Sequence, residues 1–172
     1  MTEPDGQVTK NAQQRNTFWI NDMQYMADCA GETMTLGSVQ DWNVTNDSPL
    51  GHPFHIHINP FQVLDYPNFP DIAKAGPPYP WMDTIPLPVK GCDANGVCDE
   101  VGAQIRHAFE DFTGGYVIHC HFLGHEDRGM MLNVQTVCPD SGDPGTWGRP
   151  QTAGPDNCTQ SRPALPICKP GS

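Results

Sequence analysis

The chain has 172 residues, which suits one domain with its own core plus tails, and neither its length nor its composition suggests two full domains. Its formal net charge is -11, and the sequence has no basic cluster. We therefore expect that the chain binds neither nucleic acid nor anionic membrane surfaces. No apolar run approaches the length of a membrane span, and residues 1–10 lack the features of a secretory signal.

Short apolar segments separated by Pro and Gly clusters follow one another along the chain. They are VQDWNVTN at 39–46, HIHINPFQVL at 55–64, QIRHAFEDF at 104–112 and MMLNVQTV at 130–137. This pattern is typical of an all-β sandwich. Within it, His107 matches no ligand spacing, and we interpret it as a structural residue.

Six of the seven histidines fall in two short segments, and the first of these reads HPFHIH from His52 to His57. Successive side chains on a strand point to opposite faces of the sheet. His55 and His57 are therefore predicted to share one face. We expect His52, three positions before His55, to point to the other.

The second segment, HCHFLGHEDRGM from His119 to Met130, contains a thiol, three imidazoles and a thioether in one short stretch of sequence. Cys120, His125 and Met130, with one further histidine, form the ligand set of a blue, or type 1, copper site. His52 is the candidate for that fourth ligand. Zinc also accepts Cys and His, but it gives no reason for seven spaced donors together with Met130.

The run around these ligands is rich in β-branched and aromatic residues, and it predicts a strand from Tyr116 to Phe122. Alternation along that strand puts His119 and His121 on one side and Cys120 on the other. One strand would then serve two metal sites. A short covalent path for electrons would lead from the thiolate to its two neighbours.

These motifs resemble those of a known family. HPFHIH followed by HCHFLGHEDRGMM looks like the third and fourth copper motifs of the multicopper oxidases, the laccase-like enzymes. FWIND, LGSVQDW and WMDTIPLP look like framework segments of the same family. The resemblance implies a cupredoxin-like Greek-key β-sandwich over residues 17–137. An N-terminal leader or interdomain remnant would occupy 1–16, and a Cys/Pro-rich, disulfide-pinned tail 138–172.

The resemblance also assigns the copper ligands. They are His52, Cys120, His125 and Met130 for type 1 copper, His55 for type 2 copper, and His57, His119 and His121 for the type 3 pair. Electrons would pass from Cys120 to His119 and His121. Half of the cluster histidines in this family come from two His-X-His motifs in the first domain. The chain would therefore hold one complete type 1 site and half of a trinuclear copper cluster.

The function implied by the resemblance is that of the C-terminal domain of a laccase-like oxidase. Phenols, aromatic amines or metal ions would be oxidised at type 1 copper, and dioxygen would be reduced to water at the cluster. N-terminal cupredoxin domains of the same enzyme would complete that cluster, so the isolated chain is expected to be inactive. The alternative, from a different class, is a standalone blue copper electron-transfer or copper-binding module.

Four polar residues near these motifs are expected to carry no chemistry. Glu126 and Asp127 are interpreted as solvated loop charges beside His125, although an acidic group there could accept a proton from a phenol. Asp83 and Thr84 are interpreted as framework residues.

The seven cysteines leave six once Cys120 is taken as a ligand, enough for three disulfides. Disulfides point to an oxidising compartment, so we expect a secreted or periplasmic protein. Cys92 and Cys98 flank a segment that favours a tight turn, and we expect them to be bonded to each other. The pairing of the other four stays open: Cys29, Cys138, Cys158 and Cys168.

Overall fold

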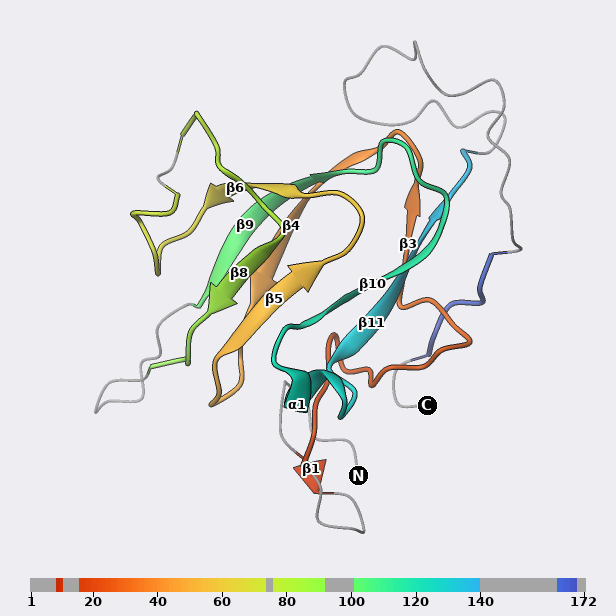
Figure 1. Ribbon diagram of the computed structural model, residues 1–172, viewed down its shortest axis with the longest axis horizontal. Coiled ribbons are helices and arrows are strands. Elements are labelled where there is room, and N and C mark those ends of the chain that lie inside the picture. Colours follow the sequence, from red (N-terminus) through yellow and green to blue (C-terminus); the bar gives the residue numbers. More distant parts are fainter. Residues whose placement is uncertain (1–8, 11–15, 74–75, 92–100, 140–163, 170–172) are drawn as a thin grey trace.

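The computed structural model describes residues 9–10, 16–73, 76–91, 101–139 and 164–169 of the chain, and their regular secondary structure consists of β-strands and one short helix (Figure 1). The elements are β1 (Thr9–Lys10), β2 (Asn16–Thr17), β3 (Glu32–Thr35), β4 (Val39–Thr45), β5 (His52–Ile56), β6 (Phe61–Asp65), β7 (Trp81–Met82), β8 (Thr84–Leu87), β9 (Gly102–Ala108), β10 (Gly114–Cys120), α1 (Leu123–Glu126) and β11 (Met131–Val137). Among the described strands, β1 and β2 pair with each other and with no other strand.

A five-stranded sheet carries both histidine segments, in the order β3-β11-β10-β5-β8. Its central strand β10 runs antiparallel to β5, with His119 opposite His55 and Cys120 opposite Phe54. On the other side of β5, His55 stands opposite Thr84 of β8. This register places the thiol and the imidazoles of two distant segments on neighbouring strands.

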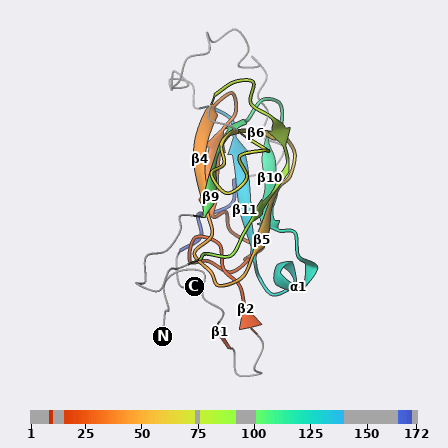
Figure 2. The same ribbon diagram turned by 90° about the vertical axis from the view of Figure 1, so that its left-hand side faces the viewer.

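A four-stranded sheet in the order β4-β9-β6-β7 packs against the first, and the two layers are seen edge-on in Figure 2. The core between them consists of fully buried aliphatic and aromatic side chains from both sheets, among them Phe61, Val63, Ile105, Ile56, Ile85 and Val134. Burial alternates along β9, as expected for a strand with one face on the core. The predicted cupredoxin-like β-sandwich is confirmed, and each of the four apolar segments contains or overlaps a strand.

Both boundaries of one strand differ by two residues from the predicted range, Tyr116 to Phe122. β10 begins at Gly114 and ends at Cys120, so His121 and Phe122 lie beyond it. At this point the backbone N–H of His121 donates to the carbonyl of Pro53 (2.8 Å), and Phe122 precedes the single helical turn α1. The turn into α1 therefore ends the strand early, despite the β-propensity of Phe122.

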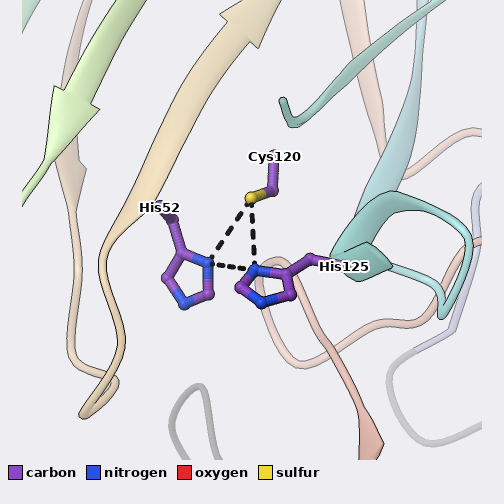
Figure 3. A group of neighbouring side chains, drawn as sticks. All are labelled: His52, Cys120 and His125. Carbon is purple, nitrogen blue, oxygen red and sulfur yellow. Dashed lines mark hydrogen bonds between the residues drawn. The ribbon is translucent and has the colours of Figure 1, made fainter. Parts of the chain in front are cut away.

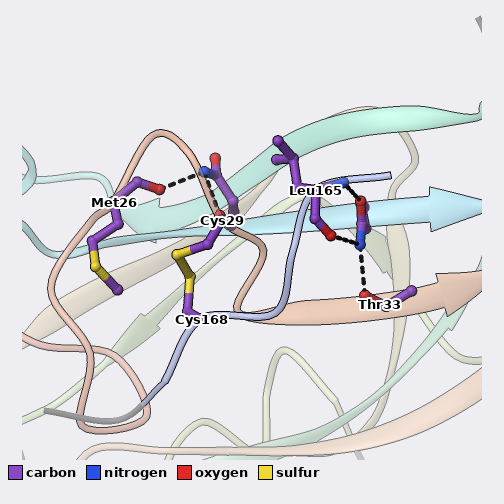
Figure 4. Close-up of a disulfide and its surroundings, with 7 residues drawn as sticks. Met26, Cys29, Thr33, Leu165 and Cys168 are labelled. Carbon is purple, nitrogen blue, oxygen red and sulfur yellow. Dashed lines mark hydrogen bonds between the residues drawn. A yellow bond between two sulfur atoms is a disulfide. The ribbon is translucent and has the colours of Figure 1, made fainter. Parts of the chain in front are cut away.

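The described part of the C-terminal tail, residues 164–169, packs against the edge of the five-stranded sheet that contains β3 (Figure 4). A disulfide joins Cys29 to Cys168, which are 139 residues apart in sequence. Nearby, the side chain of Gln135 donates to the Leu165 carbonyl (3.0 Å) and accepts from the Leu165 N–H (2.7 Å). Cys138 is also disulfide-bonded. The expected Cys92–Cys98 bond and Cys158 lie outside the described residues.

No helix among the described residues is long and apolar enough to cross a membrane.

Candidate metal centres

The first group of candidate ligands is formed by His52, Cys120 and His125, whose side chains point toward one another in Figure 3. Cys120 Sγ lies 3.5 Å from Nδ1 of His52 and 3.5 Å from Nδ1 of His125, and the two Nδ1 atoms are 3.1 Å apart. The ligands come from the start of β5, the end of β10 and α1. They converge because β5 and β10 are neighbours in the sheet and α1 turns back toward their ends.

The turn after Cys120 brings His125 and Met130 back to the thiol. The backbone N–H of Met130 donates to the carbonyl of His125 (3.1 Å), and the N–H of Cys120 donates to the carbonyl of Met130 (3.0 Å). Gly129 permits this turn, because its φ of 102° lies in a region that favours glycine. Met130 lines the same cavity of about 540 Å³ as His52 and Cys120, between β4 and the five-stranded sheet.

Burial keeps this group uncharged near neutral pH. Desolvation, reinforced by the neighbouring His125, lowers the pKa of His52 to about 4. The pKa of His125 is lowered by burial and then by the charge of Arg128. Burial raises the pKa of the Cys120 thiol, which is only 3% exposed. The metal-free group therefore consists of two neutral imidazoles and a protonated thiol.

Two residues that sequence reasoning missed hold the imidazoles of this group. Phe18 stacks on the ring of His125, with centroids 4.1 Å apart and planes at 23°, and the guanidinium of Arg128 lies 4.9 Å from the Phe18 ring centre. The hydroxyl of Ser48 lies 2.7 Å from Nε2 of His52. Both contacts depend on the folded chain, since Phe18 is more than a hundred positions from His125 in the sequence.

The second group lies on the opposite face of the five-stranded sheet and contains His55, His57 and His119, with His121 beside it. Donor atoms of the first three lie within 4.8 Å of one another, and Nε2 of His57 is 3.2 Å from Nε2 of His119. The ring centre of His121 is 5.1 Å from that of His55 and 5.4 Å from that of His119. Burial lowers the pKa of His57, and the charge of His119 lowers it further.

Hydrogen bonds fix which nitrogen of His55 is available. Its Nδ1 lies 3.0 Å from the Asp83 carbonyl and 2.8 Å from Thr84 Oγ1. A carbonyl can only accept, so Nδ1 carries the hydrogen and Nε2 keeps its lone pair. Asp83 and Thr84 therefore orient this ring, which corrects the prediction that they are framework residues without a role at the site. They reach His55 because β8 pairs with β5, and the sequence alone does not reveal this pairing.

The same argument applies to His119. Its Nδ1 lies 3.0 Å from the carbonyl of Cys120 and 3.3 Å from a carboxylate oxygen of Glu126, both of which are acceptors. Nε2 is thus left as the free donor, and it faces His57. The prediction that Glu126 is a solvated loop charge is therefore corrected, because its carboxylate lies against this histidine.

The predicted alternation of side chains holds for both histidine segments. Cys120 and His52 are buried between the sheets, while His55, His57 and His119 project from the other face and meet there. His107 is separate from both groups. It is 1% exposed, packs against Phe109 with centroids 4.6 Å apart, and has a pKa lowered to about 4 mainly by burial.

These donor sets fit copper. A buried thiol flanked by two imidazole nitrogens at 3.5 Å, all within reach of one ion, matches the soft and borderline ligands that copper prefers. Cys120 is also the free cysteine of the described residues. The opposite group offers imidazole nitrogens alone, which also suit copper.

Comparison with known proteins agrees with this geometry. Residues 1–139 match the family model described as multicopper oxidase. The chain is 34% identical over 126 residues to a laccase of Bacillus stratosphericus, covering 67% of this chain and 24% of that protein. It is 31% identical over 147 residues to a laccase of Bacillus subtilis, covering 76% and 26%.

Solved structures give the same result. A multicopper oxidase from Campylobacter jejuni, described as a metallo-oxidase, superposes with a TM-score of 0.55 at 30% identity, covering 71% of this chain and 23% of that chain. One from Pediococcus acidilactici gives a TM-score of 0.51 at 29% identity, covering 69% and 23%. The fold and donor sets define a copper-binding β-sandwich. The chain belongs to the multicopper oxidases, and it spans about a quarter of the length of these relatives.

Proposed function

We propose that the chain is the C-terminal domain of a laccase-like multicopper oxidase. His52, Cys120, His125 and Met130 would hold type 1 copper, His55 type 2 copper, and His57, His119 and His121 the type 3 pair. The observation that carries the proposal is the presence of two donor groups on opposite faces of one sheet, joined by three consecutive residues of the chain.

Copper bound at these groups would supply one-electron oxidation of a reductant at one face and reduction of dioxygen to water at the other. The chain itself contributes the connection between the two faces. Cys120 reaches the first group, and its backbone continues directly into His119 and His121 at the second. The carbonyls of Asp83 and Cys120 accept hydrogen bonds from Nδ1–H of His55 and His119, respectively, so that both rings present Nε2 to the second group.

The second group needs imidazoles from outside this chain. We propose that N-terminal cupredoxin domains of the same enzyme supply them, which is consistent with the chain spanning a quarter of its relatives. Residues 17–137 would form the domain, 1–16 a leader or interdomain remnant, and 138–172 a disulfide-pinned tail. The Cys29–Cys168 disulfide supports a secreted or periplasmic location. Phenols, aromatic amines or metal ions are the proposed reductants.

Copper titration tests the proposal. The 172-residue chain should bind one copper with an intense visible thiolate band. Cys120→Ser should abolish the band, whereas His121→Ala, at the exposed edge of the other group, should leave it intact. A band that survives in Cys120→Ser would contradict the type 1 assignment.

The cluster is tested separately by joining the chain to the N-terminal domains. Three further coppers and oxygen consumption should then appear, and His121→Ala should reduce both. One copper per chain under all conditions, with no oxygen uptake, would identify the standalone blue copper module instead.

A further inference from the structure

The loop between β4 and β5 is organised around one buried amide. The side chain of Asn46, 5% exposed, donates to the carbonyls of Leu50 (2.7 Å) and Pro88 (2.8 Å) and accepts the N–H of Ser48 (3.0 Å). These bonds tie the loop to itself and to the segment that follows β8. The loop therefore holds Ser48, which is 3% exposed, at a fixed position beside His52.

The hydroxyl of Ser48 has three polar neighbours. Its oxygen lies 2.9 Å from the carbonyl of Leu50, 3.2 Å from the N–H of Leu50 and 2.7 Å from Nε2 of His52. A hydroxyl has one hydrogen and two lone pairs. The 2.9 Å contact with the Leu50 carbonyl is a hydrogen bond in which the hydroxyl donates, because a carbonyl can only accept. The two lone pairs then accept the Leu50 N–H and a hydrogen on Nε2 of His52.

A hydrogen on Nε2 determines the other side of the ring. A neutral imidazole carries one hydrogen, so Nδ1 of His52 keeps its lone pair. That lone pair faces Sγ of Cys120 at 3.5 Å and Nδ1 of His125 at 3.1 Å. Metals bind the unprotonated nitrogen of a neutral imidazole. The ring is therefore already in the tautomer and orientation that a metal ion at this group requires.

We propose that Ser48 is a positioning residue, which fixes His52 in the Nε2–H tautomer and so prepares its Nδ1 as a metal ligand. The consequence for copper rests on the proposed function, whereas the tautomer itself does not. Removing a hydrogen-bond partner of this kind from a metal-binding histidine typically lowers the metal affinity about 10- to 100-fold.

The tautomer is measured on the metal-free chain by long-range ¹H–¹⁵N correlation of the imidazole rings. The wild-type His52 should show a protonated Nε2 and an unprotonated Nδ1. In Ser48→Ala the two tautomers should mix, and Ser48→Thr, which retains the hydroxyl, should restore the wild-type pattern. The matched control is Ser38→Ala, because the buried Ser38 hydroxyl has no hydrogen-bond partner among the described residues.

Metal affinity is measured with Co²⁺ by its thiolate absorption band, which is assigned to Cys120, the free cysteine of the described residues, by its loss in Cys120→Ser. Ser48→Ala should weaken Co²⁺ binding about 10- to 100-fold, while Ser48→Thr and Ser38→Ala should stay close to the wild type. If Ser48→Ala does not fold, Ser48→Val replaces it, because Val has the shape of the Thr variant but no hydroxyl to accept a hydrogen bond.

Two results would overturn the proposal: an unchanged His52 tautomer in the variant, or a mixed tautomer with unchanged Co²⁺ affinity. A wild-type chain with the fixed tautomer but no thiolate band on adding Co²⁺ would refute metal preparation by Ser48. It would also count against the type 1 site, whereas the Ser48–His52 contact would stand. The type 1 assignment fails by itself if copper gives no band while Co²⁺ behaves as expected.

Discussion

Metal binding at the His52/Cys120/His125 group should release one proton near neutral pH. Desolvation holds the pKa of both imidazoles below their usual range, to about 4 for His52, so they have no proton to lose. Burial raises the pKa of Cys120, so its thiol is protonated at the same pH and must ionise to bind a metal. The proton count is thus set by the thiol alone.

The magnitude follows from this count. One proton released per ion makes the apparent affinity rise tenfold per pH unit, which is about 1.4 kcal/mol. Between about pH 7 and pH 8.5, Co²⁺ binding should therefore strengthen roughly 30-fold. The slope should persist as long as the pH stays below the raised pKa of Cys120.

The assay is a Co²⁺ titration of the metal-free chain at several pH values, followed by the thiolate absorption band. Calorimetry in two buffers of different ionisation enthalpy gives the proton count independently. A slope near zero would show that the thiol is already ionised in the free protein. A slope near two would show that an imidazole is still protonated, and either result would refute the electrostatic argument.

Two further predictions concern the scaffold. Gly102→Ala should lower the free energy of unfolding by about 2–3 kcal/mol, because its Cβ would lie 2.5 Å from a backbone carbonyl oxygen of β4 that cannot move aside. In the control Gly115→Ala, whose Cβ would meet nothing within 4 Å, denaturant unfolding should change by less than about 0.5 kcal/mol. His107 is neutral when buried, with a pKa near 4 against 6.5 for an ordinary histidine. Between pH 6.5 and pH 4 the unfolded chain therefore binds more protons at this residue than the folded chain does. The contribution of neutral His107 to the free energy of unfolding is fully present above pH 6.5 and is lost as the pH falls to 4. His107→Gln should remove up to about 3 kcal/mol of this loss, and an unchanged acid dependence of chemical unfolding would count against it.

The sequence was sufficient for features that depend on strand periodicity. Alternation alone separated Cys120 from His119 and His121, because side-chain direction on a strand repeats every two residues. The same rule separated His52 from His55. The sulfur of Met130 remains a predicted ligand, although the residue lines the same cavity as Cys120.

The contacts that orient the rings could not be predicted, because they join segments whose proximity depends on the complete fold. Thr84 meets His55 only through the pairing of β8 with β5. Phe18 stacks on His125, although the two residues are far apart in the sequence. Both contacts arise from tertiary pairing, for which a single sequence contains no periodic signal.

The pairing of β10 with β5 also limits how the chain can change in length. Inserting one residue into β10 before His119 would turn the thiol outward and its neighbours inward, which would destroy both donor groups at once. Inserting two would restore the faces but displace the ligands by roughly 7 Å along the strand. Insertions are therefore expected to be tolerated in the loops that connect the strands, while the spacing from Ile118 to His121 admits none.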